Sequence, residues 1–260
     1  MKGSPIFSFS VLSSGSGGNS IYVESGVSRI LLDAGLSVKE LTLRLSSIGR
    51  KPEDLDAVFL THEHTDHVRG AGPLARRHNL PLYSTEGTLR RIGPRIGTLP
   101  RWEPLRSGRS VIVGDLCVEP YTTPHDAQEP VAFLVHHDSL KLAVATDLGH
   151  VTPLVRQRLK GAHALLVESN HDLDLLVDGP YSHSLKQRIR SDVGHLSNEA
   201  CGELLASVVH RDLRRVVLMH MSETNNRPQL VEAMARQVLS GTNVQTQIAL
   251  QDRATSLISV

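Results

Sequence analysis

The stretch that decides the fold is Ala57-Val-Phe-Leu-Thr-His-Glu-His-Thr-Asp-His67. It opens with a short apolar run, which predicts a buried strand. Directly after the run, the six residues His62–His67 hold three imidazoles and two carboxylates. Loops that leave a rigid strand often carry chemistry, and imidazole and carboxylate are standard ligands of zinc and similar divalent metals. The stretch therefore predicts a metal site at the end of a strand.

The spacing inside this stretch predicts two metal ions rather than one. His62 and His64 are two residues apart, so in extended backbone they point to the same side and can hold one ion. Asp66 and His67 follow where the chain must turn, and these two side chains can face a second ion.

The pattern His-x-His-x-Asp-His after a hydrophobic strand resembles the metallo-β-lactamase superfamily of binuclear metallohydrolases. The resemblance implies an α/β fold, a four-layer αβ/βα metallo-β-lactamase sandwich with the metals between the edges of two sheets. It also implies three later ligands at strand ends, and His125, Asp147 and His220 each follow an apolar segment. By this resemblance, one ion is bound by His62, His64 and His125, the other by Asp66, His67 and His220, and Asp147 bridges both beside a nucleophilic hydroxide.

Further segments resemble one subgroup, the YycJ-like (WalJ-like) metallohydrolases. The resemblance implies a 5′→3′ DNA exonuclease linked to mismatch repair, with DNA as its partner and two divalent ions, Zn²⁺ or Mn²⁺, as cofactors. The matching segments are Leu12–Ser20, Thr61–His67, Pro124–Ala127, Thr146–Gly149, Glu168–His171, Gly194–Asn198 and His220–Asn226.

The glycine-rich segment Ser13–Ser20 is the second chemical signal. Backbone N–H groups in such a turn can cradle an anion, although a plain hairpin turn explains the composition equally well. The segment resembles the loop that borders the metals in the nuclease and phosphodiesterase branches of the superfamily. We therefore predict substrate contacts at Ser13, Ser14, Gly17 and Asn19.

The third signal is His195, just before a helix cap predicted at Ser197. A helix N-terminus favours anions, and a histidine there can contact a phosphate or protonate a leaving alkoxide. We predict that His195 is catalytic, that Ser197 contacts the substrate, and that Asp66 orients the attacking water or accepts its proton. The resemblance adds Asp33 as a residue that orients ligands by hydrogen bonding. Glu168, at another strand exit, is open to a structural role.

Local patterns predict an alternation of strands and helices. Ser37-Val-Lys-Glu40 is a capping box that starts a helix. Asp66 to His78 is predicted as one helix, and Thr152-Pro153 begins another. The order gives two halves that each run from strands to helices, and we expect residues 1–260 to form a single domain.

Composition limits the partners. The formal net charge is +1, so contact with nucleic acid must come from local patches. The arginine-rich stretch Arg90–Arg109 offers one such patch, with Trp102 available to stack on a base, although a solvated charged face is the more common interpretation of such a stretch. The sequence indicates no oligomeric state.

Several features predict a cytoplasmic protein without membrane association. Met1–Phe7 lacks the apolar core of a secretion signal, and no apolar run of about 18 residues occurs. Cys117 and Cys201 lie far apart in apolar or helical patterns, which favours buried thiols over a disulfide.

Three alternative functions remain. A phosphodiesterase acting on cyclic or nucleotide diesters would use the same metal centre. A glyoxalase II-like thioesterase carries a similar histidine motif, but Ser13–Ser20 and Gly194–Asn198 argue against it. A non-enzymatic binding module would not need a complete set of ligands.

Overall fold

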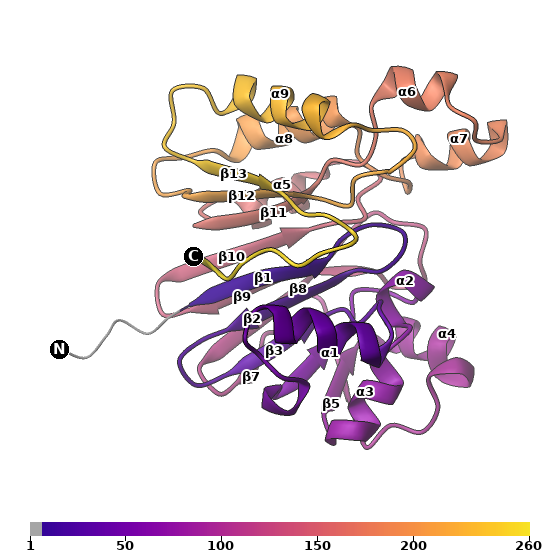
Figure 1. Cartoon of the computed structure of the whole chain (residues 1–260), viewed down its shortest axis with the longest axis vertical. Coiled ribbons are helices and arrows are strands. Elements are labelled where there is room, and N and C mark those ends of the chain that lie inside the picture. Colours follow the sequence, from indigo (N-terminus) through magenta and orange to yellow (C-terminus); the bar gives the residue numbers. More distant parts are fainter. Residues whose placement is uncertain (1–6) are drawn as a thin grey trace.

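The computed structural model describes residues 7–260, and the N-terminal segment on which the secretion-signal prediction rests lies largely outside them. Within the described residues, two sheets pack face to face and helices cover their outer faces (Figure 1). In the first sheet the spatial order is β14-β1-β2-β3-β4-β5-β6, and in the second it is β13-β12-β11-β10-β9-β8-β7.

Each sheet combines antiparallel and parallel pairing. In the first, β1, β2 and β3 pair antiparallel and β3 to β6 pair parallel. In the second, β7 to β10 pair antiparallel and β10 to β13 pair parallel. The strand bounds are β1 Ser8–Ser13, β2 Ser20–Glu24, β3 Arg29–Leu32, β4 Ala57–Phe59, β5 Pro81–Ser84, β6 Arg101–Pro104, β7 Val111–Val113, β8 Leu116–Thr122, β9 Val131–His137, β10 Leu140–Ala145, β11 Ala164–Glu168, β12 Arg215–Met219, β13 Gln245–Ile248 and β14 Ile258–Ser259.

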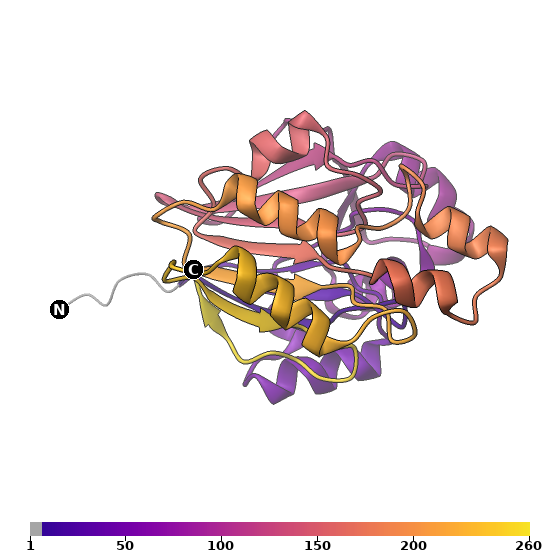
Figure 2. The same cartoon turned by 90° about the horizontal axis from the view of Figure 1, so that it is seen from above.

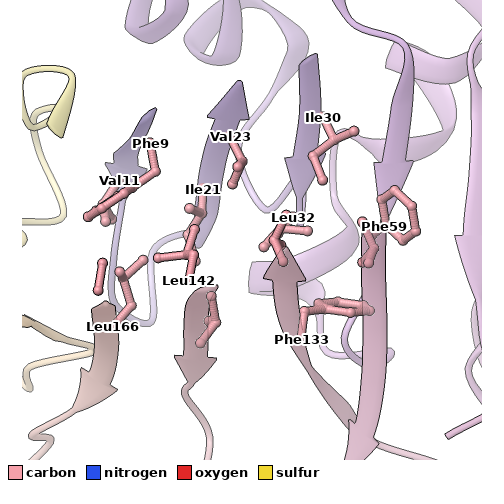
Figure 3. Close-up of a cluster of buried hydrophobic side chains, with 14 of the residues drawn as sticks. Phe9, Val11, Ile21, Val23, Ile30, Leu32, Phe59, Phe133, Leu142 and Leu166 are labelled. Atoms are coloured by element: carbon pink, nitrogen blue, oxygen red, sulfur yellow. The ribbon is translucent and has the colours of Figure 1, made fainter. Parts of the chain in front are cut away.

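The main core lies between the two sheets (Figure 3). Phe59 of the first sheet meets Phe133 of the second edge to face, with ring centroids 5.8 Å apart. Alternate residues of a strand face opposite layers. In β3, Leu32 points into the central layer between the sheets, whereas Leu31 packs under the helices of the first half. Strands buried on both faces read as continuous apolar runs, which is why β4 and β11 carry no polar alternation.

The helices begin where the sequence provides caps. The side chain of Ser37 accepts a hydrogen bond from the N–H of Glu40 at 3.2 Å, and Thr152 accepts one from Val155 at 3.1 Å, so both predicted caps are confirmed. The helix bounds are α1 Val38–Ser47, α2 Thr65–Val68, α3 Ala71–His78, α4 Glu86–Ile96, α5 Pro153–Leu159, α6 Leu173–Asp178, α7 His183–Ile189, α8 Asn198–Val208 and α9 Pro228–Val238, with a 3₁₀ turn at Pro52–Asp54.

The prediction of one helix from Asp66 to His78 is wrong, because the chain forms α2 and α3 with a break at Gly70. The N–H of Gly70 bonds to the carbonyl of Ala34 at 2.8 Å. A Cβ at Gly70 would lie 2.1 Å from the carbonyl oxygen of Leu36. This close approach to the turn after β3 interrupts the helix.

The sequence reasoning also missed β6, β14, α6 and α7. β6 is largely exposed and joins the sheet through its backbone pairing with β5, so it has no hydrophobic pattern. The two short helices stand at the end of the sandwich where α2 also lies (Figures 1 and 2). Within residues 7–260, none of the helices has the length and apolar character needed to cross a bilayer.

Candidate metal centre

The predicted ligands meet at one edge because they follow strands whose ends meet there. His62 to His67 follow β4, His125 follows β8, Asp147 follows β10 and His220 follows β12. Asp147 and His220 have positive φ angles of 57° and 53°, in the left-handed region that side chains other than glycine seldom adopt. Such backbone strain concentrates at functional sites.

The structure brings all seven predicted ligands into one cluster. The ligand atoms of His62, His64 and His125 lie within 4.8 Å of one another, and so do those of Asp66, His67 and His220. Asp147 lies between the two groups: its Oδ2 is 3.5 Å from Nε2 of His67, and its Oδ1 is 3.5 Å from Nε2 of His220 and 3.8 Å from Nε2 of His125.

The cluster fits divalent cations. Oδ2 of Asp147 and Nε2 of His220 are buried and have no hydrogen-bond partner, a costly state for polar atoms unless a further group binds them. Burial and the neighbouring His67 hold the pKa of His62 well below its ordinary value, which leaves the neutral imidazole that ligates metals. The donors are nitrogen and carboxylate oxygen, a set that suits zinc and manganese.

The carboxylates make this cluster favourable for positive charge. Burial alone would lower the pKa of His67, but Asp147 and Asp33 outweigh it and raise that pKa well above its ordinary value. Burial would raise the pKa of Asp147, but His220 and His67 hold it well below its ordinary value. A bound cation would take the place of the proton that the carboxylates favour.

Asp33 fixes the orientation of His67, as the resemblance implied. Its Oδ2 accepts a hydrogen bond from Nδ1 of His67 at 2.8 Å, and its Oδ1 accepts one from the N–H of Thr61 at 2.8 Å. This bond leaves Nε2 of His67 as the nitrogen that faces the cluster. Hydrogen bonds of this kind orient ligands and tune metal affinity.

His195 lies beside the cluster and is held by Glu168. Its Nδ1 donates to Oε1 of Glu168 at 2.6 Å, and its ring centroid is 5.1 Å from that of His220. Burial would lower the pKa of His195, but the Glu168 carboxylate outweighs it and raises that pKa. Because Nδ1 is hydrogen-bonded to Glu168, Nε2 is the nitrogen that can exchange a proton with a substrate.

Glu168 is the residue whose role the sequence left open. It is fully buried, and its Oε2 accepts a hydrogen bond from the N–H of Leu148 at 2.8 Å. Burial would raise its pKa, but His195 and His220 lower it to about 2. The feature that could have indicated its role is its position at the end of β11. This strand lies between β10 and β12, which lead to Asp147 and His220.

The glycine-rich loop does not present the predicted row of free N–H groups. The N–H of Gly15 bonds to Oδ1 of Asn19 at 2.8 Å, that of Gly17 to Oε1 of Gln251 at 2.6 Å, and that of Asn19 to the carbonyl of Asp66 at 2.7 Å. An anion cradle built from these groups is therefore not formed. The loop instead positions the backbone of Asp66 through the hydrogen bond from Asn19.

The serines at the other predicted contacts also bond within the protein. Oγ of Ser14 accepts a hydrogen bond from the N–H of His220 at 2.7 Å, and Ser13 donates to the carbonyl of Gln251 at 2.8 Å. Ser197 caps α8 by accepting from Ala200 at 3.2 Å. These contacts give the three serines positioning roles, and contact with a substrate stays a prediction.

Trp102 is partly buried, and stacking of its ring on a base stays a prediction. Its indole N–H donates to Oγ of Ser84 at 2.9 Å, and its ring packs against the core under the helices of the first half. The local sequence, a tryptophan among arginines, gave no sign of this packing.

Comparison with protein families matches residues 28–221 to the beta-lactamase superfamily domain. The chain belongs to the metallo-β-lactamase superfamily. The predicted four-layer α/β sandwich is thereby confirmed. Membership, together with the two exodeoxyribonuclease relatives described next, supports a metal-dependent hydrolase.

Within this superfamily the chain is one of the WalJ/YycJ-like members. It is 38% identical over 224 residues to the exodeoxyribonuclease WalJ of Streptococcus pneumoniae serotype 2, covering 85% of this chain and 83% of that protein. It is 39% identical over 233 residues to the exodeoxyribonuclease YycJ of Bacillus anthracis, covering 89% of this chain and 88% of that protein.

Solved structures of the superfamily share the fold at low identity. The metallo-β-lactamase fold protein YhfI of Bacillus subtilis matches with a TM-score of 0.74 and 17% identity, covering 96% of this chain and 99% of that one. Zn²⁺-bound PqqB of Methylobacterium extorquens matches with a TM-score of 0.74 and 20% identity, covering 95% and 99%.

Proposed function

We propose that this protein is a 5′→3′ DNA exonuclease that works with two divalent ions, Zn²⁺ or Mn²⁺, and serves DNA repair. The observation that carries the proposal is the His195–Glu168 pair, which lies beside a complete set of seven candidate ligands. Identity of 38–39% to two exodeoxyribonucleases over most of both chains supports DNA as the substrate in this proposal.

The candidate ligands are His62, His64, Asp66, His67, His125, Asp147 and His220. When bound, paired divalent ions activate an attacking water and neutralise the charge of the phosphodiester. Around them, the chain supplies orientation and proton transfer. Burial would raise the pKa of Asp66, but the hydrogen bond with His220 and the charge of His67 lower it. Asp66 therefore stays a carboxylate at neutral pH and can orient the water or accept its proton.

His195 is placed to protonate the leaving oxygen. Glu168 raises the pKa of His195 above its ordinary value, which favours the protonated form that a general acid requires. Glu168 fixes the imidazole tautomer through Nδ1 and so directs the proton on Nε2 toward the substrate. Its bond to the N–H of Leu148 also fixes the backbone next to Asp147.

We place the protein in the cytoplasm in this proposal. Both Cys117 and Cys201 are free thiols, and Cys201 is buried. Proteins of reducing compartments keep their cysteines in this state.

The test of the proposed function is hydrolysis of 5′-labelled and 3′-labelled duplex DNA, single-stranded DNA and RNA, with Mn²⁺ or Zn²⁺. We expect stepwise loss of nucleotides from DNA 5′ ends by the wild type and none by Asp147→Ala. If neither DNA nor RNA is cut while a chromogenic phosphodiester is still hydrolysed, the exonuclease proposal is wrong and a small diester is the substrate.

The role of His195 has a separate test. His195→Ala should lose activity on DNA, whose leaving alkoxide needs a proton, by about 10²–10⁴-fold. It should retain far more activity on a p-nitrophenyl diester, whose leaving group departs without one. Equal losses on both substrates would exclude the general-acid role.

A further inference from the structure

A hollow of about 240 Å³ opens beside His195 and His220. One side is formed by the segment that carries α6 and α7, which stands at the same end of the sandwich as α2 (Figures 1 and 2). The other side is formed by the glycine-rich loop and the segment after β12. The hollow therefore adjoins the atoms to which the proposed function assigns chemistry.

The lining of the hollow is divided between apolar and polar side chains. Tyr181, Leu185, Ile189 and Met221 provide flat or apolar surface. The polar side chains of the lining include Ser16, Asn170, Ser222 and the paired Arg188 and Asp126. A planar ring with polar edges, such as a nucleobase, matches this division.

Tyr181 is the aromatic side chain, besides the histidines, among the residues that line this hollow. It is half-buried and lies in the short connection between α6 and α7. Aromatic side chains bind bases of any sequence because every base has a π-face. An exonuclease that removes nucleotides in succession needs such a sequence-independent contact.

Hydrogen bonds at both ends of the connection fix the backbone segment that carries Tyr181. Ser182 caps α7 by accepting from the N–H of Leu185 at 3.3 Å, and Nζ of Lys186 donates to the carbonyl of Val177 at 2.6 Å. A Cβ at Gly179 would lie 2.3 Å from Oδ1 of Asn225, so only glycine permits this close approach.

A salt bridge ties α7 to the metal-binding edge. Nε of Arg188 lies 2.6 Å from Oδ2 of Asp126, and Oδ1 of Asp126 lies 3.3 Å from Nε2 of His125. The wall that carries Tyr181 is thus fixed relative to the candidate ligands. A ring bound against it would have a defined position relative to His195.

We infer that Tyr181 stacks on the 5′-terminal nucleobase of the strand being cut, and that the hollow holds one unpaired nucleotide. The inference rests on the proposed exonuclease function and specifies its substrate. The volume, about 240 Å³, is below the roughly 300–1,000 Å³ of drug-sized ligand sites and suits a single base. We therefore expect a duplex end to open by one pair before the terminal nucleotide is cut.

The test compares two single-stranded oligonucleotides that differ only at the 5′ end, one ending in thymidine and one in an abasic tetrahydrofuran residue. We expect wild-type kcat/KM to be about 5- to 150-fold higher for the thymidine end, the range that stacking on one aromatic side chain contributes. Tyr181→Phe keeps the ring and should keep this preference. Tyr181→Leu has similar bulk without the ring and should lose it.

The ratio of the two kcat/KM values separates stacking from a structural role. If Tyr181→Leu, or Tyr181→Ala where the leucine variant does not fold, lowers kcat/KM equally for both ends, the inference is overturned. A wild-type enzyme that cuts both ends at the same rate overturns it without any variant. If the wild type cuts neither oligonucleotide but still degrades duplex DNA from its 5′ ends, the stacking inference fails and the proposed function stands; if it cuts no DNA at all, both fail.

A second expected result concerns duplex ends. A single mismatch at the 5′ end removes the cost of opening the terminal pair and should raise the rate of the first cleavage. Equal rates for matched and mismatched ends would contradict a hollow that accepts only an unpaired nucleotide.

Discussion

Substitution of Gly35 by alanine should damage the metal centre although it replaces none of the candidate ligands. Gly35 lies in the turn after β3, where its N–H bonds to the carbonyl of Asn19 at 2.9 Å. A Cβ added here would lie 1.7 Å from the carbonyl oxygen of Asp66 and 2.6 Å from the backbone nitrogen of Asn19. Both atoms belong to backbone, which cannot rotate away as a side chain can.

The size of the effect follows from these distances. To reach the 3.0 Å that real Cβ contacts keep, the Asp66 backbone must move by at least 1.3 Å relative to Gly35. Misplacement of a catalytic group by about 1 Å can cost about 10²-fold in rate. We therefore expect Gly35→Ala to lose at least about 100-fold in kcat/KM. Overpacking should also lower the free energy of unfolding by about 1–3 kcal/mol.

The assay combines metal content, urea denaturation and phosphodiester hydrolysis. Gly26 provides the matched control: it lies in the β2–β3 turn, and a Cβ there would meet no atom within 4 Å. Gly26→Ala should leave activity unchanged and alter stability by no more than about 1 kcal/mol. Wild-type metal content and activity in Gly35→Ala would refute the reasoning that this close backbone contact positions Asp66.

Three further outcomes are expected. Glu24→Gln should lower the free energy of unfolding by about 1.5–3 kcal/mol at pH 7, because Arg50 bonds to this buried carboxylate at 2.6 Å through each of two nitrogens. Burial would raise the pKa of Glu24, but Arg50 and Tyr22 lower it. In urea titrations, the extra stability of the wild type over Glu24→Gln should be full above pH 4.5 and lost as the pH falls through the lower pKa of the folded state. Extra stability that persisted in acid would exclude the ion pair as its cause. Phe133→Ala should cost about 3–5 kcal/mol in the same assay, because the ring is fully buried between the sheets, and a loss below about 1 kcal/mol would mean that the core closes around the gap. Removal of metal by a chelator should lower the melting temperature, since a metal at 100 times its Kd adds about 2.7 kcal/mol, and an unchanged melting temperature would show that the cluster around Asp147 is stable without a cation.

Much of the architecture could be predicted because its signals are local. An apolar run such as that of β4 is buried on both faces, and its composition alone indicates this. The caps at Ser37 and Thr152 bond to N–H groups three residues away, so short sequence patterns predict them. The errors occurred where a distant segment acts on the chain, as at Gly70, where the turn after β3 breaks the predicted helix.

The candidate site shows the same division. The sequence fixes which side chains can bind a metal, and the resemblance to the metallo-β-lactamase superfamily, with their positions after apolar strands, made the seven candidates recognisable. How each group is used depends on partners far along the chain: the N–H of Gly17 is occupied by Gln251, 234 residues away. A glycine-rich sequence therefore indicates free N–H groups only when no distant residue accepts their hydrogen bonds in the folded protein.

The sequence by itself determined which donors this protein has, the strand ends at which they lie, and the sandwich that their pattern implies. The tertiary structure alone decided that Glu168 orients His195, that the glycine-rich loop braces Asp66, and that Tyr181 borders the centre. The physical reason is the distance along the chain over which each interaction acts. Hydrophobic periodicity and helix capping act over a few residues, whereas hydrogen-bond partners and hollows arise only when parallel strands bring distant segments to one edge.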